Sequence, residues 1–366
     1  INVNNQLRGH LTEIAPDGSL RGDLASEWMS DDAKTWVFRV RPGVEFHNGK
    51  TLDATDVVES FRHHMGPESK SAASGLAAQI EEVRADGDTV VFVLGTPNAD
   101  WPFIVSDYHF AICPARAEGG IDWRSGVGTG GYVLETFDPG VRTFVRRFEN
   151  YWKQDAAFFD SIDNLFIADA TARTNALRSG EIESMANLDP KVAGLMERDP
   201  NVTVLITTGN KHATLPMHCN TAPFDNPDVR MALKLALDRQ QALDTIAFGY
   251  GEIGNDHPIG PANTFRATPE ELPQREYDPE RAKFHLQQAG LDGLTVDLHV
   301  ADTAFEGAVD MGSLYAEAAK AAGIDIRVVR EPDDGYWSDV WLVKPWCASY
   351  WGGRPTEDWM FSQVYQ

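Results

Sequence analysis

Cysteine is scarce in this chain, with three residues in 366. Cys113, Cys219 and Cys347 are far apart, and no two of them form a CxxC pair. A zinc knuckle or a dithiol redox motif needs such close pairs, so the sequence excludes both. One disulfide with a free thiol, or three buried thiols, are the two alternatives left.

Positive charge is also scarce. Lysine and arginine together number 32 against 55 aspartates and glutamates, which gives a net charge of -23. Nucleic-acid binding depends on cationic contacts to phosphate, so this class of function is excluded. The acidic balance allows a cationic ligand, but solubility alone explains it better.

Long apolar runs are missing. No stretch approaches the roughly 18 consecutive apolar residues that cross a bilayer. The opening residues, Ile1, Asn2 and Val3, do not begin a basic-then-apolar signal peptide. We expect either that a signal peptide is removed or that the start of the chain is not represented.

Common catalytic and phosphate-binding motifs are absent as well. The chain has no GxSxG or HExxH pattern. The glycine-rich segment 126–132 lacks the Lys-Ser/Thr of a P-loop, and Tyr132 starts a predicted strand where phosphate binding needs a helix N-terminus. We expect these glycines to allow close backbone packing.

The histidines do not form a recognisable metal site. His63 and His64 are adjacent, so on a helix their side chains point about 100° apart. His212 and His218 can face one way along a strand, but no third ligand is spaced nearby. His257 is a loop residue with one acidic neighbour. We predict neither a bound metal nor a cofactor.

What the chain does contain is a regular series of strands and helices. Residues 36–40 and 89–94 have strand signatures, and 51–61 form an amphipathic helix behind a polar cap. The second half alternates predicted helices (170–179, 226–237, 278–290 and 311–321) with predicted strands (202–206, 295–300 and 324–329). This βαβ order predicts an α/β fold with mixed or parallel sheets flanked by helices.

An ordered set of short phrases gives the chain a family resemblance. The phrases are GDLASEW (22–28), TWVFRVRPGV (35–44), FHNGK (46–50), LDATDV (52–57), GTGGY (128–132), NYW (150–152), RSGEI (178–182), NTAPFD (220–225), VRMAL (229–233), ALDR (236–239) and YDPERA (277–282). Together they resemble family 5 of the extracellular solute-binding proteins of ABC transporters, which includes oligopeptide, dipeptide and nickel binders.

The resemblance implies a two-lobed fold of the periplasmic-binding-protein type II (cluster C) kind, with mixed sheets and a hinge. Lobe I is expected at 1–212, with an inserted subdomain at about 18–128, and lobe II at 213–366. Members usually carry a segment before Asn4 and continue beyond Gln366, so we expect lobe II to be truncated on its C-terminal side.

The resemblance also implies a function. Such a protein captures a small solute (peptide-like, opine-like or another polar compound) between its lobes and delivers it to ABC permease subunits in the membrane. We therefore expect a periplasmic monomer that closes around its ligand and performs no chemistry on it.

One departure from the family concerns the ligand. Peptide-binding members use a buried aspartate, shortly before an Asn/Asp-x-Pro turn, to pair with the α-ammonium of the ligand. When the proline of that turn is aligned with Pro355 of this chain, the residue at the position of the aspartate is Trp351. An indole cannot neutralise a buried ammonium, which argues against an ordinary peptide bound in the family's way. Glu357 and Asp358 are candidates for that role at shifted spacing, with capping of a helix start as the alternative.

The remaining candidates also follow from the resemblance. Trp351 is either a stacking platform, with space cleared by Gly352 and Gly353, or a core residue. Arg354 either meets a ligand carboxylate or forms an internal salt bridge. The other candidate ligand-binding residues are Asn4, Asn5, Asp107, Tyr108, His109, Tyr336, Trp337 and Tyr350, with a capping turn as the alternative for 107–109.

Two rival functions use the same scaffold: a secreted hydrolase and an oligosaccharide-binding protein. A hydrolase would use Glu357 and Asp358 as paired carboxylates beside an aromatic subsite. Adjacent carboxylates on one segment are poorly placed to flank a bond, so we do not expect an enzyme.

Overall fold

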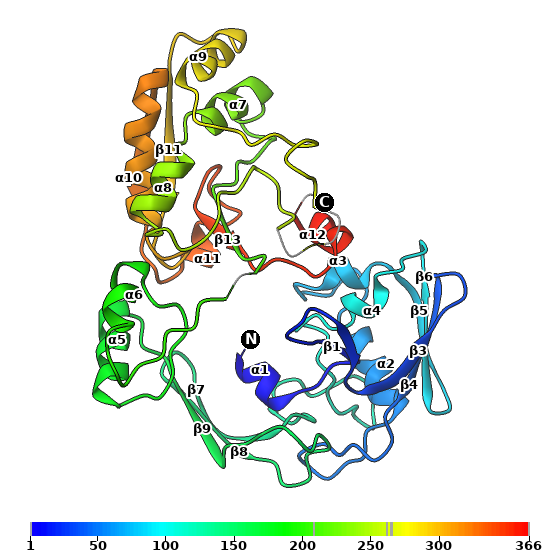
Figure 1. Cartoon of the computed structure of the whole chain (residues 1–366). Coiled ribbons are helices and arrows are strands. Elements are labelled where there is room, and N and C mark those ends of the chain that lie inside the picture. The colour runs from blue at the N-terminus through cyan, green and yellow to red at the C-terminus, as the bar shows by residue number, and fades with distance from the viewer. Residues whose placement is uncertain (1, 208, 261–262, 264–265, 365–366) are drawn as a thin grey trace. The chain divides into compact units, whose positions relative to one another are not determined.

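A computed structural model describes residues 2–207, 209–260, 263 and 266–364 of the chain. The chain divides into two compact units (Figure 1). Unit 1 comprises residues 1–167 together with 355–366, and unit 2 comprises residues 168–354. The predicted lobes, divided at residue 212, and the subdomain at 18–128 stay predictions.

Unit 1 is built on antiparallel sheets. Its four-stranded sheet has the order β3-β4-β6-β5, β7-β8-β9 form a second sheet, and β1-β2 form a third. The elements are α1 (Asn2–Leu7), β1 (Thr12–Ile14), β2 (Leu20–Gly22), β3 (Ala25–Met29), β4 (Thr35–Val40), α2 (Ala54–Arg62), α3 (Ser74–Ala77), β5 (Ile80–Asp86), β6 (Thr89–Leu94), α4 (Trp101–Ile104), β7 (Tyr132–Asp138), β8 (Arg142–Arg147), β9 (Ser161–Leu165) and α12 (Glu357–Val364).

The four-stranded sheet shows how the alternation in the sequence becomes a core. On β4, Trp36, Phe38 and Val40 are buried, whereas Arg39 is exposed, as a period of two requires. Phe38 meets Phe92 of β6 edge to face, with ring centroids 5.6 Å apart. The predicted strands at 36–40 and 89–94 are therefore confirmed.

Helix α2 starts where the sequence predicts a cap. The Asp53 side chain accepts hydrogen bonds from the backbone N–H groups of Thr55 and Asp56, and the Asp56 side chain accepts one from the backbone of Asp53. This capping box satisfies N–H groups that a helix start leaves unpaired. The helix buries Val57, Val58 and Phe61, so a single amphipathic face attaches it to the core.

The glycine-rich segment packs against α1. An added Cβ would lie 2.1 Å from the Leu7 carbonyl oxygen at Gly128, and 2.4 Å from the Gln6 carbonyl oxygen at Gly130. The Gly130 N–H donates to the Leu7 carbonyl at 2.9 Å. The predicted close backbone packing is confirmed, because only glycine leaves room for this contact.

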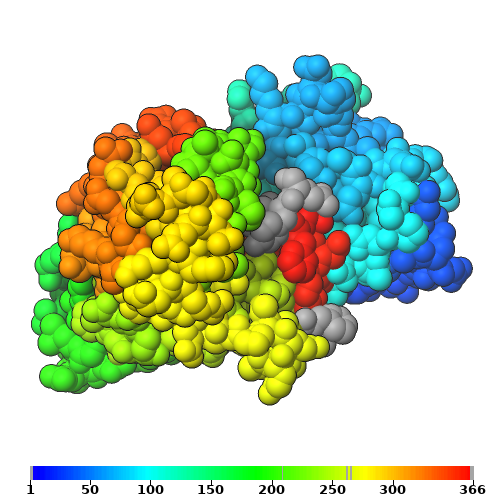
Figure 2. Space-filling view, turned by 90° about the horizontal axis from the view of Figure 1, so that it is seen from above, coloured from blue at the N-terminus to red at the C-terminus, as the bar shows by residue number. Residues whose placement is uncertain are grey.

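Unit 1 also receives the helix α12 from the far end of the sequence. Trp359 on this helix is 3% exposed and belongs to the same core cluster as Phe38 and Phe61. The red residues of α12 lie against blue and cyan residues of unit 1 (Figure 2), and the helix contacts α3.

Unit 2 alternates helices with short strands. Its elements are α5 (Ala170–Ser179), α6 (Pro190–Met196), β10 (His212–Thr214), α7 (Pro227–Leu235), α8 (Arg239–Thr245), α9 (Pro279–Gln288), β11 (Leu294–Val300), α10 (Ala308–Ala319), the 3₁₀-helix η1 (Lys320–Ala322), β12 (Ile324–Arg330), α11 (Tyr336–Asp339) and β13 (Ser349–Trp351).

The predicted βαβ unit is confirmed in unit 2. Strands β11 and β12 pair in parallel, with Leu294 opposite Ile324 and Val300 opposite Arg330. The connection between them contains α10, which lies alongside the strands (Figure 1). The core of this unit includes Leu298 and Tyr315, and the Tyr315 hydroxyl donates to the Leu233 carbonyl at 2.5 Å.

The predicted buried strand at 202–206 is wrong. The structure has no strand there, and Leu205 and Ile206 are 84% and 64% exposed. Apolar and β-branched residues favour an extended backbone, but a strand also needs a neighbour for its N–H and C=O groups. None of the described strands pairs with this segment.

Candidate ligand-binding residues

In unit 1, the structure brings Asn4 and Tyr108 together. The Asn4 side-chain amide donates to the Tyr108 carbonyl at 2.9 Å, across 104 positions of sequence. Arg8 in turn donates from Nη1 to the Asn4 side-chain oxygen at 2.8 Å. Helix α1 thus holds Asn4 against the segment that contains Tyr108.

The turn 107–109 is held by its own acidic residue. Asp107 is 3% exposed, and its Oδ1 accepts a hydrogen bond from the His109 backbone N–H at 2.9 Å. The same oxygen lies 2.6 Å from His109 Nδ1, so this ring nitrogen donates to the carboxylate. The Tyr108 and His109 rings lie 3.9 Å apart at 33°. Asp107 therefore caps the turn, which was the alternative to a ligand-binding role for this segment. The rings of Tyr108 and His109 are partly exposed.

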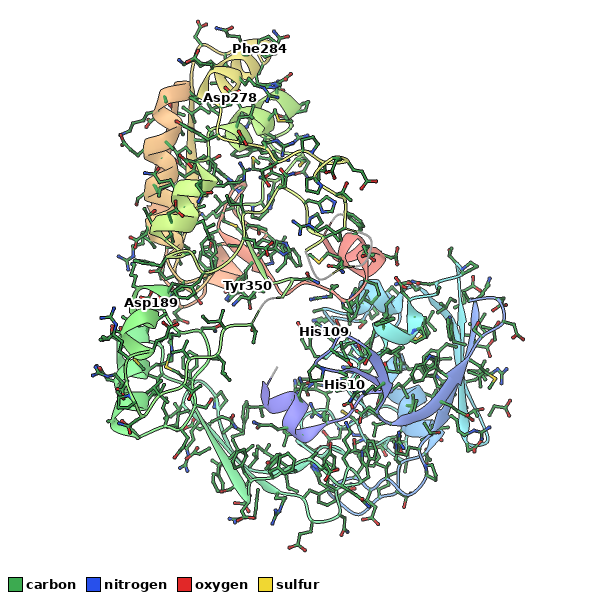
Figure 3. The ribbon with its side chains drawn as sticks, in the orientation of Figure 1. His10, His109, Asp189, Asp278, Phe284 and Tyr350 are labelled. Carbon is green, nitrogen blue, oxygen red and sulfur yellow. The ribbon has the colours of Figure 1, made fainter. Side chains whose placement is uncertain are left out.

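A histidine that the sequence did not single out lies in the same part of unit 1. His10 is 9% exposed, and its Nε2 has no hydrogen-bond partner among the described residues. Burial lowers the pKa of His10, although the charges of Asp23 and Asp107 act in the opposite direction. Figure 3 labels His10 and His109 in this part of unit 1. No periodicity or motif marks His10, so only the folded chain could reveal it.

Asn5 has a different environment from Asn4. It lines a cavity of about 300 Å³, whose other lining residues are Gln6, Gly131, Tyr132, Tyr151, Ala156 and Ala157. The Gln6 amide is already paired with Asn164, at 3.2 and 3.1 Å in the two directions. Asn5 is exposed and is therefore the amide with room to meet a ligand.

In unit 2, the candidate residues form a cluster of aromatic rings. Trp337 on α11 meets Tyr350 on β13 at 5.7 Å, and Trp341 meets Trp351 at 5.8 Å. Trp337 and Trp341 are themselves 6.4 Å apart. Trp341, which no sequence signal marked, lies just beyond the end of α11 at Asp339.

The cluster contains both buried and exposed members. Tyr336 is 1% exposed, and its hydroxyl donates to the Ala348 carbonyl at 2.7 Å. Trp337 and Tyr350 are 42% and 39% exposed. Tyr336 therefore supports the cluster from the core, whereas Trp337 and Tyr350 offer surface to a ligand.

The glycines after Trp351 do not share one role. Gly353 has φ +57°, and an added Cβ would lie 2.3 Å from the Asn210 Cβ. Gly352 has only the Arg354 guanidinium nearby, at 3.8 Å. Gly353 thus lets the chain pass close to Asn210, and space beside Trp351 can come from Gly352 alone. Arg354 donates from Nη1 to the Gly353 carbonyl at 2.9 Å.

Glu357 and Asp358 lie in the first turn of α12, in unit 1. Asp358 Oδ2 accepts a hydrogen bond from the Asn98 amide at 3.3 Å. Burial raises the pKa of Asp100, and the charges of Asp358 and Glu357 raise it further. Acidic residues in a first helical turn are favoured by the helix dipole. This position fits the helix-start alternative, and their ammonium-binding role stays a prediction.

Among the residues that the structure describes, no three His, Cys, Asp or Glu side chains are grouped to hold a metal ion. His64 Nδ1 lies 2.6 Å from the Ser71 hydroxyl. No helix in the described part of the chain is long and apolar enough to cross a membrane.

The cysteines do not match either expected state fully. All three are free thiols, and Cys113 and Cys347 are buried, as the alternative of three buried thiols predicts. Cys219 is exposed.

Curated proteins of similar sequence are binding proteins by name. The dipeptide-binding protein of Escherichia coli K12 is 28% identical over 316 residues, which cover 78% of this chain and 57% of the relative. Heme-binding protein A of Haemophilus influenzae is 30% identical over 299 residues, which cover 73% of this chain and 53% of the relative. The chain thus spans about half the length of these relatives.

Solved structures share the fold. The binding protein AgaA of A. tumefaciens R10, in complex with agropinic acid, has a TM-score of 0.87 at 22% identity and covers 98% of this chain and 74% of its own. The periplasmic binding protein DppA of Helicobacter pylori, in complex with the peptide STSA, has a TM-score of 0.85 at 20% identity, with 98% and 75% covered. These likenesses confirm the predicted α/β fold, that of two-lobed periplasmic binding proteins.

The family resemblance is confirmed directly. The family model described as "Bacterial extracellular solute-binding proteins, family 5 Middle" matches residues 19–366. The chain therefore belongs to family 5 of the bacterial extracellular solute-binding proteins.

Proposed function

We propose that the protein is the substrate-binding component of an ABC importer, which captures a small polar solute in the periplasm and passes it unchanged to membrane permease subunits. The observation that carries this proposal is the family match over residues 19–366. The ligand we propose is peptide-like, opine-like or another polar compound, and the protein acts as a monomer.

The arrangement of the candidate residues supports binding over catalysis. The groups that are exposed (Asn5, Trp337 and Tyr350) or partly exposed (Tyr108 and His109) are an amide and rings, which recognise a ligand by hydrogen bonding and stacking. The carboxylate pair that a hydrolase would need, Glu357 and Asp358, occupies adjacent positions of one helical turn. Such neighbours do not flank a bond.

A thermal-shift screen tests the proposal. The full chain is mixed with peptides, opine-like conjugates, polyamines and oligosaccharides, and its melting temperature is measured. A ligand at a hundred times its Kd stabilises the native state by about 2.7 kcal/mol, which raises the melting temperature clearly. Calorimetry then gives the affinity, and mass spectrometry of the recovered compound shows whether it is unchanged. Turnover of the compound, or no binding in any class, would overturn the proposal.

Variants identify the residues that bind. Each unit supplies its own group of candidates, and a two-lobed binding protein is expected to need both. We expect Asn5→Ala in unit 1 and Trp351→Ala in unit 2 each to weaken the ligand found in the screen. Phe284→Ala, an exposed aromatic residue on α9 (Figure 3), is the matched control and should leave the affinity unchanged. Unchanged affinity in Trp351→Ala would remove Trp351 from the site.

A further inference from the structure

The strand pair β10–β13 carries a local charge opposite to that of the chain. Residues 209–214 and 349–354 contain no aspartate or glutamate, but they include Lys211, His212 and Arg354. The whole chain has a net charge of -23. A stretch of this kind attracts anions within the acidic surface, because nearby charges dominate over distant screened ones.

The register of the pair places Lys211 beside an exposed ring. Ala213 lies opposite Tyr350, and His212 lies opposite Trp351. Since side chains alternate along a strand, Lys211 and Ala213 share the face of Tyr350. The Lys211 ammonium lies 5.1 Å from the centre of the Tyr350 ring. Ala213 has only a methyl group, and Tyr350 keeps 39% of its surface exposed.

Trp337 extends this exposed surface. Its ring meets Tyr350 edge to face at 79° and is 42% exposed. We call Trp337, Tyr350 and Lys211 the aromatic shelf; Tyr350 is labelled in Figure 3.

The shelf is held in place from behind. Trp341 and Trp351 form the second pair of the ring cluster, and Tyr336 anchors the start of α11 by its bond to Ala348. Rings that are already fixed lose little conformational entropy when a ligand stacks on them. Such preorganisation is typical of a binding surface.

The chemistry of the shelf selects a ligand class. Exposed indole and phenol rings favour a planar apolar group. Lys211 already occupies the position over the Tyr350 ring that a ligand cation would take, and a second cation there would meet a like charge. An anionic group on the ligand, by contrast, would gain a charge-assisted contact with the Lys211 ammonium.

We infer that the solute carries an aromatic or similarly planar group next to a carboxylate or other anion, and that the aromatic shelf of unit 2 recognises this part of it. This inference rests on the proposed function. It specifies the ligand class: unit 2 contacts the planar, anionic part of the solute and not the α-ammonium end of a peptide.

Three probes with one ring and different charges test the inference on the full chain. They are N-acetylphenylalanine (anionic), N-acetylphenylalaninamide (neutral) and phenylalaninamide (cationic), with affinities measured by ligand-observed NMR titration. We expect the anion to bind roughly tenfold more tightly than the cation, with the neutral probe between them. Added salt should reduce this difference. Equal or tighter binding of the cation would overturn the inference.

Variants localise the effect. Lys211→Gln should weaken the anionic probe to about the affinity of the neutral probe and leave the neutral probe unchanged, whereas Lys211→Arg should retain binding of the anion. Tyr350→Ala should weaken both probes, and Phe284→Ala should weaken neither. Unchanged affinity of the anion in Lys211→Gln would refute the role of the shelf. If the screen also yields a solute whose binding ignores these variants, the inference fails while the proposed function stands; no binding of any compound would reject both.

Discussion

Gly128 and Gly130 show how single residues position a candidate segment. Both lie under the last turn of α1, where an added Cβ would meet carbonyl oxygens of the helix backbone. The Gly128 carbonyl also accepts a hydrogen bond from the His47 N–H at 2.9 Å. Helix α1 carries Asn4 and Asn5, so these glycines fix the first-lobe candidates indirectly.

Replacing Gly128 by alanine should therefore destabilise unit 1. The new methyl group would force the backbone of α1 away, and overpacking of this kind costs about 1–3 kcal/mol. Chemical denaturation would measure the loss. Gly75→Ala is the control, because a Cβ at exposed Gly75 meets no atom within 4 Å. Equal stability of the two variants would contradict the close approach of α1.

His64 gives unit 1 a specific dependence on pH. Burial, with smaller contributions from His63 and His109, lowers the pKa of His64 from 6.5 to about 4. The unfolded chain therefore binds a proton at a higher pH than the folded chain does. The free energy of unfolding has its full His64 contribution above pH 6.5 and loses it as the pH falls towards about 4.

The variant His64→Gln should flatten this dependence. It cannot take up the proton, so its stability should fall less than that of the unmodified chain between pH 7 and pH 4.5. Denaturant midpoints at several pH values measure the difference, and an NMR titration of the His64 ring gives its pKa directly. Parallel pH profiles of the two proteins would show that His64 does not cause the effect.

At the scale of helices and strands, local signals were the most reliable. The Asp53 cap predicted α2, and Gly180, which adopts φ +75°, predicted the end of α5. Alternation predicted β4, and an apolar run after the turn at 86–88 predicted β6. These features depend on residues within one element, which is why the sequence contains them. The prediction of a strand at 202–206 was wrong, because an apolar, β-branched pattern favours an extended backbone but does not show which strand would pair with it.

The cap of α2 provides a prediction at this scale. Asp53→Ala should lower the stability of unit 1 by about 1 kcal/mol, since it leaves helix N–H groups unpaired. Asp53→Asn keeps a side-chain oxygen and should retain most of the stability. Thermal denaturation of the three proteins makes the comparison. A loss as large in Asp53→Asn as in Asp53→Ala would mean that the carboxylate has a role other than capping.

The candidate site was less predictable than the fold. The contact between Asn4 and Tyr108 joins segments that no periodicity connects, and Lys211 reaches Tyr350 only through the pairing of β10 with β13. Resemblance to a family supplied most of the candidates, but it gave no contacts between them. His10 has no local signal at all, because its importance comes from burial beside distant residues.

At the scale of the whole molecule, the free cysteines report on each unit separately. Cys113 lies in unit 1 and Cys347 in unit 2, each 2% exposed, whereas Cys219 is exposed. Burial raises the pKa of both buried thiols, that of Cys347 to about 11. Thiolate is the reactive form, so Cys113 and Cys347 are protected from thiol reagents both by burial and by their raised pKa.

A thiol reagent should accordingly label Cys219 rapidly in the native protein and the other two only on unfolding. With increasing denaturant, mass spectrometry of the labelled peptides follows Cys113 for unit 1 and Cys347 for unit 2. Separate midpoints would show that the units unfold independently, and coincident midpoints that they unfold together. Rapid native labelling of Cys113 or Cys347 would contradict their burial.

The return of residues 355–366 to unit 1 has a consequence for biogenesis. Residues 168–354 are nested within the sequence of unit 1, and Trp359 of α12 packs into the same core cluster as Leu11. A ribosome makes the chain from its N-terminus, so all of unit 2 emerges before helix α12 of unit 1. All of unit 2 can therefore fold before unit 1 receives α12.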